Sequence, residues 1–135
     1  MSPKKISFKK IDYSKYEIYL KKAEDFYSSM FLSFTEKNWN SVGLEAVHCA
    51  ISATDALLVR RKGVRSTSQD HRDLIDFMVE QINTEDARKY SNTLLRIISM
   101  KNIVEYEDRP FREKEATDIL KCTERYFKWI KSQML

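Results

Sequence analysis

The sequence predicts a single all-α domain, folded as an antiparallel up-down bundle of four long helices plus one short helix. Three observations support this prediction. The chain of 135 residues contains only two Gly and two Pro, whereas a β-rich fold of this length needs more of them for tight turns. Apolar side chains recur every three or four positions in long segments. Hydrophobic residues make up 42% of the chain, which is typical of a globular domain with one core.

The clearest helix is predicted over residues 14–36. Its apolar side chains are three and four positions apart, so they form one continuous stripe on a helix. The residues before it are basic, with lysine at positions 4, 5, 9 and 10. We therefore predict a basic N-terminal tail over residues 1–12 and a helical domain over residues 13–135. The stripe consists of Tyr16, Tyr19, Leu20, Ala23, Phe26, Tyr27, Met30, Phe31 and Phe34.

A second helix is expected over residues 42–62. Residues 38–41 provide turn and N-cap chemistry before it, and Gly63 follows it, where a left-handed residue commonly ends a helix. Alanines and larger apolar side chains are mixed around most of its circumference. A helix that is apolar on all sides is usually buried, so we expect this one to be the central helix of the bundle.

The remaining helices are delimited by polar and proline positions. A polar loop over residues 64–69, in which a Ser or Thr acts as N-cap, precedes a short helix around residues 74–79. A break near Asn83 separates it from a fourth helix, which begins at Thr84 and ends before Pro110 because proline and its preceding residue are incompatible with a helix interior. The last helix is predicted over residues 112–134, with apolar positions again on one face.

Several functional classes lose support from the sequence. It has no glycine-rich phosphate-binding loop, no HExxH and no paired CxxC motif. Cys49 and Cys122 fall inside helical patterns and are predicted to be buried thiols of a reducing compartment. We expect no metal site and no cofactor. Because no apolar run of about 18 residues and no secretory signal occurs, we also expect a cytoplasmic protein with no membrane partner.

The net charge of +4 is concentrated in two places, the N-terminal lysines and the cluster Arg60, Arg61, Lys62 and Arg65. Such clusters suit a polyanionic partner, but they are also typical of a solvated tail and of a helix C-terminus. Both interpretations stay open from the sequence.

Three polar residues lie in otherwise apolar helical segments. His48, on the central helix, is predicted to be a core or interface histidine. His71 opens the short helix, where it hydrogen-bonds a neighbouring helix end or helps to shape a groove. Asp55 interrupts the small-residue face of the second helix, and a buried carboxylate needs a partner such as an Arg or Lys from another helix.

A polar cluster is predicted late in the fourth helix, formed by Lys101, Asn102 and Tyr106. The structural interpretation is that Lys101 extends along the apolar stripe and pairs with Glu105 at i+4. The functional interpretation is one binding site. Because Lys101 and Tyr106 are about 140° apart on an ideal helix, they act together only if the helix distorts or if two copies of the protein bring these helices side by side.

The chain resembles the HEPN family of small helical domains from Tyr16 to the C-terminus. Three strings carry the resemblance: residues 48–58, the His71-Arg72-Asp73-Leu74 string, and residues 101–106. The last string is similar to the family signature of an arginine, a polar residue, three further residues and a histidine. Asn102 matches the signature, whereas Lys101 replaces the arginine and Tyr106 replaces the histidine.

The resemblance implies a role with RNA or nucleotides. Family members with the Arg/His pair are metal-independent ribonucleases in which two protomers build one cleft, and many are toxins beside a nucleotidyltransferase-type antitoxin. The two replacements favour binding over cleavage, because a phenol is a poor base near neutral pH and lysine lacks the bidentate fork of arginine.

Three functions remain open from the sequence. The first is a homodimer that binds RNA or a nucleotide-bearing partner through Lys101, Asn102 and Tyr106, with Arg109 adding charge at the mouth of the groove. The second is a non-catalytic interaction subunit that pairs with a nucleotidyltransferase-type protein. The third is a metal-independent ribonuclease that uses a divergent Lys/Tyr pair.

Overall fold

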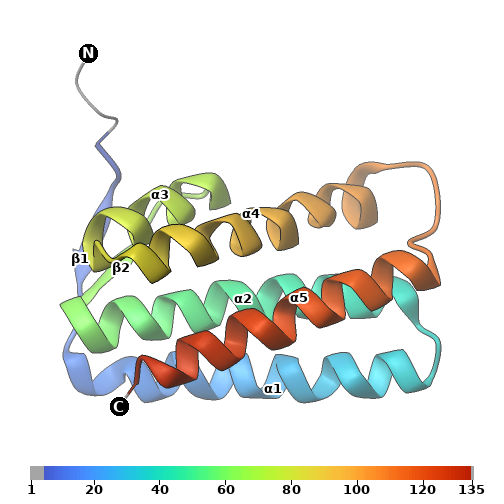
Figure 1. Cartoon of the computed structure of the whole chain (residues 1–135), viewed down its shortest axis with the longest axis horizontal. Helices are drawn as coiled ribbons and strands as arrows, with labels where there is room; N and C mark the ends of the chain where they lie inside the picture. Colours follow the sequence, from blue (N-terminus) through green and yellow to red (C-terminus); the bar gives the residue numbers. More distant parts are fainter. Residues whose placement is uncertain (1–4, 135) are drawn as a thin grey trace.

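The computed structural model describes residues 5–134 as a bundle of α-helices with one small strand pair. The four long helices run in alternating directions, and the short helix lies between the second and third long helices of the chain (Figure 1). The predicted all-α bundle of four long helices and one short helix is confirmed. The elements are β1 (Phe8–Lys10), a 3-10 helix η1 (Tyr13–Lys15), α1 (Tyr16–Thr35), α2 (Trp39–Lys62), β2 (Val64–Ser66), α3 (His71–Ile82), α4 (Glu85–Tyr106) and α5 (Glu113–Ser132).

Helix α2 is the centre of the bundle, as predicted. It contacts α1, α3, α4 and α5, and an unbroken run of buried residues extends from Ala53 to Val59. Its alanines let the neighbouring helices approach closely, while its leucines and valines fill the space between them at the density of a protein interior. Burial of this helix therefore requires that all the other long helices pack around it.

The same helix is long and apolar enough to meet the length and composition criteria for a membrane span. Within Trp39–Lys62, an 18-residue window has a mean hydropathy of 1.5, and 72% of that window is buried inside the bundle. The central helix of a globular core meets these criteria as well, because it also lacks a polar face. The other helices cover it here, so its apolar surface is already satisfied within the domain.

The packing of α1 differs in part from the predicted stripe. Ala23 and Met30 are fully buried, and most of the aromatic side chains are half-buried against the core. Phe31 is exposed instead, with 36% of its surface accessible, and its ring meets Tyr27 edge-on at 5.0 Å between centroids. The stripe is wider than the surface that α2 and α5 cover, which leaves its flank open to solvent.

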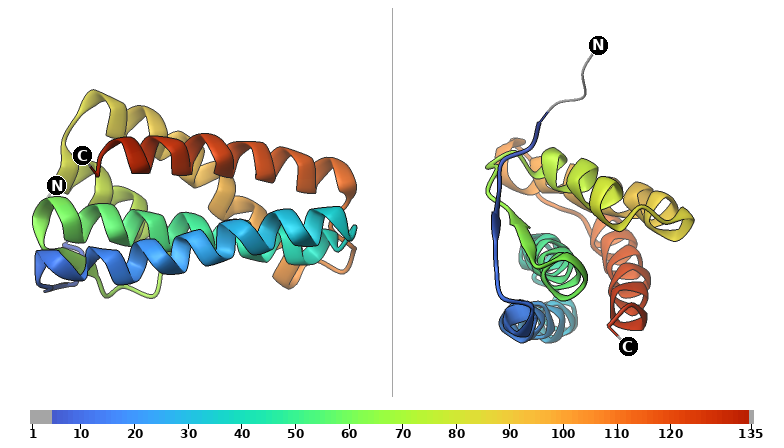
Figure 2. Two further views of the ribbon diagram at one scale, coloured as in Figure 1. Left: turned by 90° about the horizontal axis from the view of Figure 1, so that it is seen from below. Right: turned by 90° about the vertical axis from the view of Figure 1, so that its left-hand side faces the viewer.

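Part of the N-terminal segment predicted as a basic tail over residues 1–12 forms the strand β1, which the sequence did not predict. β1 pairs with β2 in antiparallel register, with Lys9 opposite Arg65, and the side chain of Ile6 is buried. The strand pair lies on one side of the bundle, away from α5 (Figure 2). Lysine at position 4 and residues 1–3 lie outside the described part of the chain.

Gly63 connects this strand pair to the central helix. It ends α2 in the left-handed conformation with φ of +62°, as predicted, and its carbonyl accepts a 2.8 Å hydrogen bond from the backbone N–H of Ile11. A Cβ atom here would lie 3.1 Å from the carbonyl oxygen of Ile11 and from the ring of Tyr13. Both the backbone conformation and the close approach therefore favour glycine.

Buried polar atoms link three helices in the core. The hydroxyl groups of Tyr126 on α5 and Thr54 on α2 are 2.6 Å apart, and the Tyr126 hydroxyl also lies 3.2 Å from the sulfur of Met78 on α3. Cys49 and Cys122 are buried free thiols, as predicted. Burial raises the pKa of Cys49 to about 12, so its thiol stays protonated and behaves as an apolar side chain.

Asp55 has the cationic partner that its position requires. Its carboxylate lies 3.3 Å from Nε of Arg65 on β2, so the pair ties the small sheet to the central helix. Only 7% of the Asp55 side chain is exposed. Burial outweighs the nearby guanidinium and raises the pKa of Asp55 to about 6.

This shift predicts how stability depends on pH. A group whose pKa is raised in the folded state stabilises the fold when protonated and loses that contribution as the pH rises through the folded pKa. Relative to the non-titrating variant Asp55→Asn, the free energy of unfolding of the natural protein should fall by about 3 kcal/mol between about pH 4 and about pH 7.5. Urea denaturation of both proteins measures the difference, and a constant difference across this range would contradict the assignment.

Candidate functional site

The predicted polar cluster lines a pocket between the start of α3 and the second half of α4. The pocket has a volume of about 260 Å³. Lys101, Asn102 and Tyr106 all line it, together with His71 and Arg72 from the first turn of α3. The three residues predicted from the sequence are therefore brought together in one pocket of one protomer, and α3 contributes a histidine and an arginine.

The pocket follows almost half of the circumference of α4, which explains how Lys101 and Tyr106 share it. On an ideal helix Asn102 lies between these two positions, which are about 140° apart. Ile98 and Asn102 line the middle of the pocket. The start of α3 lies along this wide face, so neither helix distortion nor a second protomer is needed to bring Lys101 and Tyr106 to one site.

The first turn of α3 is fixed by local hydrogen bonds. Asp70 is the N-cap, and its carboxylate accepts a 2.9 Å hydrogen bond from the backbone N–H of Arg72. The hydroxyl of Ser68 donates to the carboxylate of Asp73 at 2.7 Å and accepts from the backbone N–H of Asp70 at 3.1 Å. Ser68 thus supports the cap without being the N-cap residue, and these contacts hold His71 and Arg72 at the pocket wall.

Lys101 makes the ion pair expected from the structural interpretation. Its ammonium nitrogen lies 3.2 Å from the carboxylate of Glu105 one turn later, with 20% of the Lys101 side chain exposed. Asn102 is exposed, and Tyr106 has 73% of its surface accessible. An exposed tyrosine beside a half-buried cation presents a ring and a hydroxyl to an approaching ligand.

His71 is the titratable side chain of the pocket that differs most from its ordinary state. Burial lowers the pKa of His71, and the positive charges of Lys101 and His48 lower it further. Asp70 and Glu105 oppose this change but do not reverse it. His71 is therefore neutral at pH 7, and a neutral imidazole both accepts and donates hydrogen bonds.

Of the two positions predicted for His48, core or interface, the structure excludes the core and places the ring at the contact between α2 and α1. His48 is exposed on α2 and stacks on Phe26 of α1, with 5.3 Å between ring centroids. Its neighbours Val47 and Cys49 are fully buried, because adjacent helical positions point about 100° apart. His48 lies close enough to His71 for its charge to affect that pKa.

Arg109 does not line the pocket, which corrects its prediction as a ligand-binding residue. Its guanidinium makes a bidentate pair with Glu115, at 2.9 and 2.8 Å, and its Nε lies 3.2 Å from Glu107. This pairing raises the pKa of Arg109 and lowers that of Glu115. Glu115 also accepts a hydrogen bond from the backbone N–H of Arg112, so Arg109 fixes the connection between α4 and α5.

A close helix contact anchors the end of α4 that carries the pocket. A Cβ atom on Gly43 of α2 would lie 2.7 Å from Cγ2 of Val104 and 3.2 Å from the ring of Phe111. The backbone N–H of Phe111 also donates a 3.0 Å hydrogen bond to the side chain of Asn40. Glycine in α2 therefore lets the end of α4 approach the central helix more closely than alanine would.

The pocket presents hydrogen-bond donors, cations and an aromatic ring to one small volume. Lys101 and Arg72 supply positive charge, Asn102 and His71 supply donors, and Tyr106 supplies a ring surface. One acid, Asp70, also lines the pocket, and its carboxylate accepts the capping hydrogen bond of α3. This set is suited to an anion that carries an aromatic group, since each part of such a ligand finds a matching side chain. Among residues 5–134, no group of three or more His, Cys, Asp or Glu is placed to hold a metal ion.

Comparison with known protein families identifies the family of this chain. A family model described as the HEPN domain matches residues 16–133. A search of curated proteins finds no match. The matched segment begins at the first residue of α1, ends one residue after α5 and includes the pocket on α3 and α4. Since it covers nearly the whole chain, the chain belongs to the HEPN domain family.

Proposed function

We propose that the protein binds RNA, or a partner that carries a nucleotide, through the pocket of His71, Arg72, Lys101, Asn102 and Tyr106. The observation that carries this proposal is the meeting of two cations, two hydrogen-bond donors and an exposed tyrosine in a volume of about 260 Å³. A phosphate needs the cations and donors, and a base or sugar needs the ring.

Arg72 supplies what the replacement of arginine by Lys101 removes. The guanidinium of an arginine binds two phosphate oxygens at once, whereas a lysine ammonium acts as a point charge. Arg72 is exposed on the first turn of α3 and lines the same pocket as Lys101. In the proposed complex Arg72 holds the phosphate in a bidentate manner, and Lys101 and Asn102 contact its remaining oxygens.

Lys101→Gln should weaken binding of a labelled single-stranded RNA about tenfold, which corresponds to about 1.4 kcal/mol. The slope of log affinity against log salt should also fall by about 0.7, the value for one lost phosphate contact on a single strand. Glu105→Gln should have the opposite effect, since it frees Lys101 from its ion pair. Fluorescence anisotropy measures both, and equal affinities for the three proteins would contradict the proposal.

A homodimer is the second part of the proposal. Five exposed residues lie on one flank of α4 at three- and four-residue spacing, and none of them is covered within the protomer. Leu95 and Tyr106 are 41% and 73% exposed, so the flank offers apolar surface that a second copy of the chain would cover. Pairing of two such flanks would place two pockets beside each other. The flank consists of Asn92, Leu95, Ser99, Asn102 and Tyr106.

If the protein is a homodimer, introducing a charge at two exposed leucines should have different effects on its oligomeric state. Leu95→Asp should convert the protein to a monomer, because the carboxylate would be buried in the α4 interface without a partner. Leu32→Asp is the matched control, since Leu32 is more exposed, at 65%, and lies on α1. Sedimentation equilibrium at micromolar concentration measures the mass of each. Dimers in both variants, or a monomeric natural protein, would count against this part of the proposal.

RNA cleavage is a second candidate function because His71 places a neutral imidazole in the phosphate pocket. In this reaction the imidazole accepts the proton of a ribose 2′-hydroxyl, the 2′-oxygen forms a bond to phosphorus, and the bond from phosphorus to the 5′-oxygen breaks. A water molecule returns a proton to the leaving oxygen. Lys101 and Arg72 stabilise the negative charge that develops on the phosphate. A histidine whose pKa is lowered is in the correct state to act as the base at neutral pH.

His71→Gln separates cleavage from binding. The amide keeps a hydrogen-bond donor but cannot accept a proton, so cleavage should fall at least about a hundredfold, the contribution of a general base, while RNA affinity changes little. In the natural protein the cleavage rate should rise with pH and reach its plateau at a lower pH than for a histidine with an ordinary pKa, because burial lowers the pKa of His71. Gel analysis of a uniformly labelled RNA tests this, and unchanged cleavage in the variant would exclude His71 as the base.

A further inference from the structure

We infer that the exposed face of α5 binds the sugar–phosphate backbone of single-stranded nucleic acid, with a base in a hollow on each side of the helix. We call this surface the α5 face and define it by Lys121, Arg125, Lys128 and Lys131. The inference rests on the proposed function in one respect, namely that the ligand is a nucleic acid. No residue of the α3–α4 pocket belongs to the α5 face.

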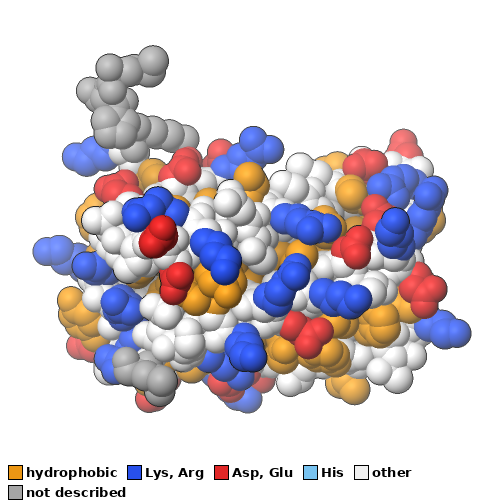
Figure 3. Space-filling view, viewed as in Figure 1, with side chains coloured by type: hydrophobic (Ala, Val, Ile, Leu, Met, Phe, Trp, Pro, Cys, Tyr) orange, Lys and Arg blue, Asp and Glu red, His pale blue; other side chains and the backbone are white. Residues whose placement is uncertain are grey.

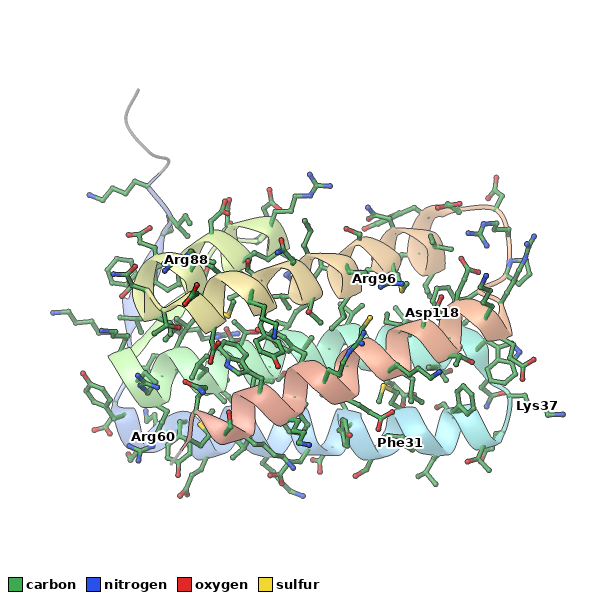
Figure 4. The ribbon with its side chains drawn as sticks, in the orientation of Figure 1. Phe31, Lys37, Arg60, Arg88, Arg96 and Asp118 are labelled. Carbon is green, nitrogen blue, oxygen red and sulfur yellow. The ribbon has the colours of Figure 1, made fainter. Side chains whose placement is uncertain are left out.

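The cations of the α5 face form no ion pair within the described chain, and one acid, Glu124, lies among them on α5. Elsewhere in the described chain, Lys and Arg residues on α1, β2, α4 and the connection after α4 form ion pairs. None of the ion pairs between residues 5–134 includes a Lys or Arg of α5. Figure 3 shows Lys and Arg side chains spread over α4 and α5, with apolar and acidic side chains between them. Arg96 of α4 lies on the same side of the bundle (Figure 4).

Two hollows flank the central pair of cations. One has a volume of about 410 Å³ and lies between α1 and α5, and the other has a volume of about 400 Å³ and lies between α4 and α5. Arg125 and Lys128 line both hollows. Each volume lies in the range of about 300–1,000 Å³ that is usual for small-molecule sites, so each is large enough for a base.

An aromatic pair forms a wall of each hollow. In the hollow beside α1, Tyr27 and Phe127 lie 5.0 Å apart. In the hollow beside α4, Tyr90 is stacked on Trp129, with 4.7 Å between ring centroids and 7° between ring planes. Tyr27 and Tyr90 are both half-buried, and the ammonium nitrogen of Lys89 lies 5.5 Å from the centroid of the Tyr90 ring. A base that takes the place of this ammonium group on Tyr90 would extend the existing stack by one ring.

Arg125 and Lys128 are placed to follow a phosphate backbone that runs between the hollows. They are three positions apart, so their Cβ atoms are about 5–6 Å apart on one side of the helix. The guanidinium of Arg125 also donates a hydrogen bond to the sulfur of Cys122 at 3.6 Å, which holds it over the helix. The strand would therefore place its phosphates on the two cations and turn its bases outward to either side.

The aromatic walls favour nucleic acid over other polyanions. An acidic peptide or an anionic membrane would use the positive charge but has no group that needs a flat aromatic wall on each side of it. Single-stranded nucleic acid uses both, since its backbone binds cations and its bases stack on aromatic rings. The other two occupants are outcomes that the experiment distinguishes.

The test compares two double variants with the same change in charge. Arg125→Gln/Lys128→Gln removes the central cations of the α5 face. Lys9→Gln/Lys37→Gln removes two exposed cations outside α5, of which Lys9 lies on β1 and Lys37 lies at the end of the bundle opposite Arg60 (Figure 4). The probe is a fluorescein-labelled oligouridylate of about 12 nucleotides, within the site sizes of single-strand binders. Circular dichroism and urea denaturation confirm that each variant is folded.

The first double variant should bind the probe at least about tenfold more weakly, and its salt slope should be smaller by about 1.4, the value for two phosphate contacts on a single strand. The control should stay within about twofold of the natural protein. Equal losses in the two double variants would overturn the proposal, because they would show that only the net charge matters.

Tyr90→Leu tests the contribution of base stacking to affinity separately from the contribution of charge. It should weaken binding of the oligouridylate about fivefold or more, the lower range for loss of one stacked base, while leaving the affinity for inorganic polyphosphate unchanged. Equal effects on the two ligands would overturn the proposal and favour an acidic partner.

Lys101→Gln measured with the same probe distinguishes this proposal from the pocket proposal. If Arg125→Gln/Lys128→Gln weakens binding of the probe and Lys101→Gln has no effect on it, the pocket proposal is rejected and the α5 face is supported. The reverse pattern would reject the α5 face and support the pocket.

Discussion

Burial of α2 is the constraint on which the rest of the structure depends. This helix has no polar face over most of its length, so it is stable in water only when several helices surround it. The surrounding helices need small side chains to approach and large ones to fill the gaps, and α2 provides both. Near the start of α2, Gly43 lets the end of α4 approach the helix closely. At the end of α2, the carbonyl of Gly63 accepts a hydrogen bond from Ile11, which directly follows the N-terminal strand. The central helix thereby fixes the positions of elements that are far apart in the sequence.

The candidate site follows from this arrangement. Because α2 holds the second half of α4 through Gly43 and Val104, the start of α3 packs beside a fixed surface, and the two elements enclose polar side chains. Lys101 has a long apolar stem that packs along the helix and a charge that reaches the pocket. The half-buried position of His71 lowers its proton affinity, so the same packing that builds the pocket also keeps its imidazole neutral. The packing of α3 against α4 therefore determines both the shape of the pocket and the protonation state of His71.

Helix periodicity was sufficient to predict the helices, but not their exposed surfaces or the strand pair. Lys101, Asn102 and Tyr106 were grouped because their string is similar to a family signature, although helical spacing alone put Lys101 and Tyr106 on different faces. Gly63 was identified as a left-handed cap because it directly follows a helical pattern. His71 and Arg72 could not be assigned to the pocket, since their contact with α4 arises only when α3 folds back. Arg109 was misassigned because its acidic partners lie in the next helix and the loop. β1 was missed because a three-residue strand has too few residues for an alternating pattern. The exposure of His48 was not predicted, because sequence neighbours on a helix differ in burial.

The central claim is that the junction of α3 and α4 is a binding site for a phosphate-bearing ligand rather than a packing feature. Amide chemical shifts in ¹⁵N-labelled protein, followed while a short single-stranded RNA is added, test it residue by residue. The account predicts that the amides of residues 69–72 and 98–106 shift in a saturable manner. If these amides stay unchanged while the RNA binds elsewhere, or if the RNA causes no shifts at all, the account is contradicted.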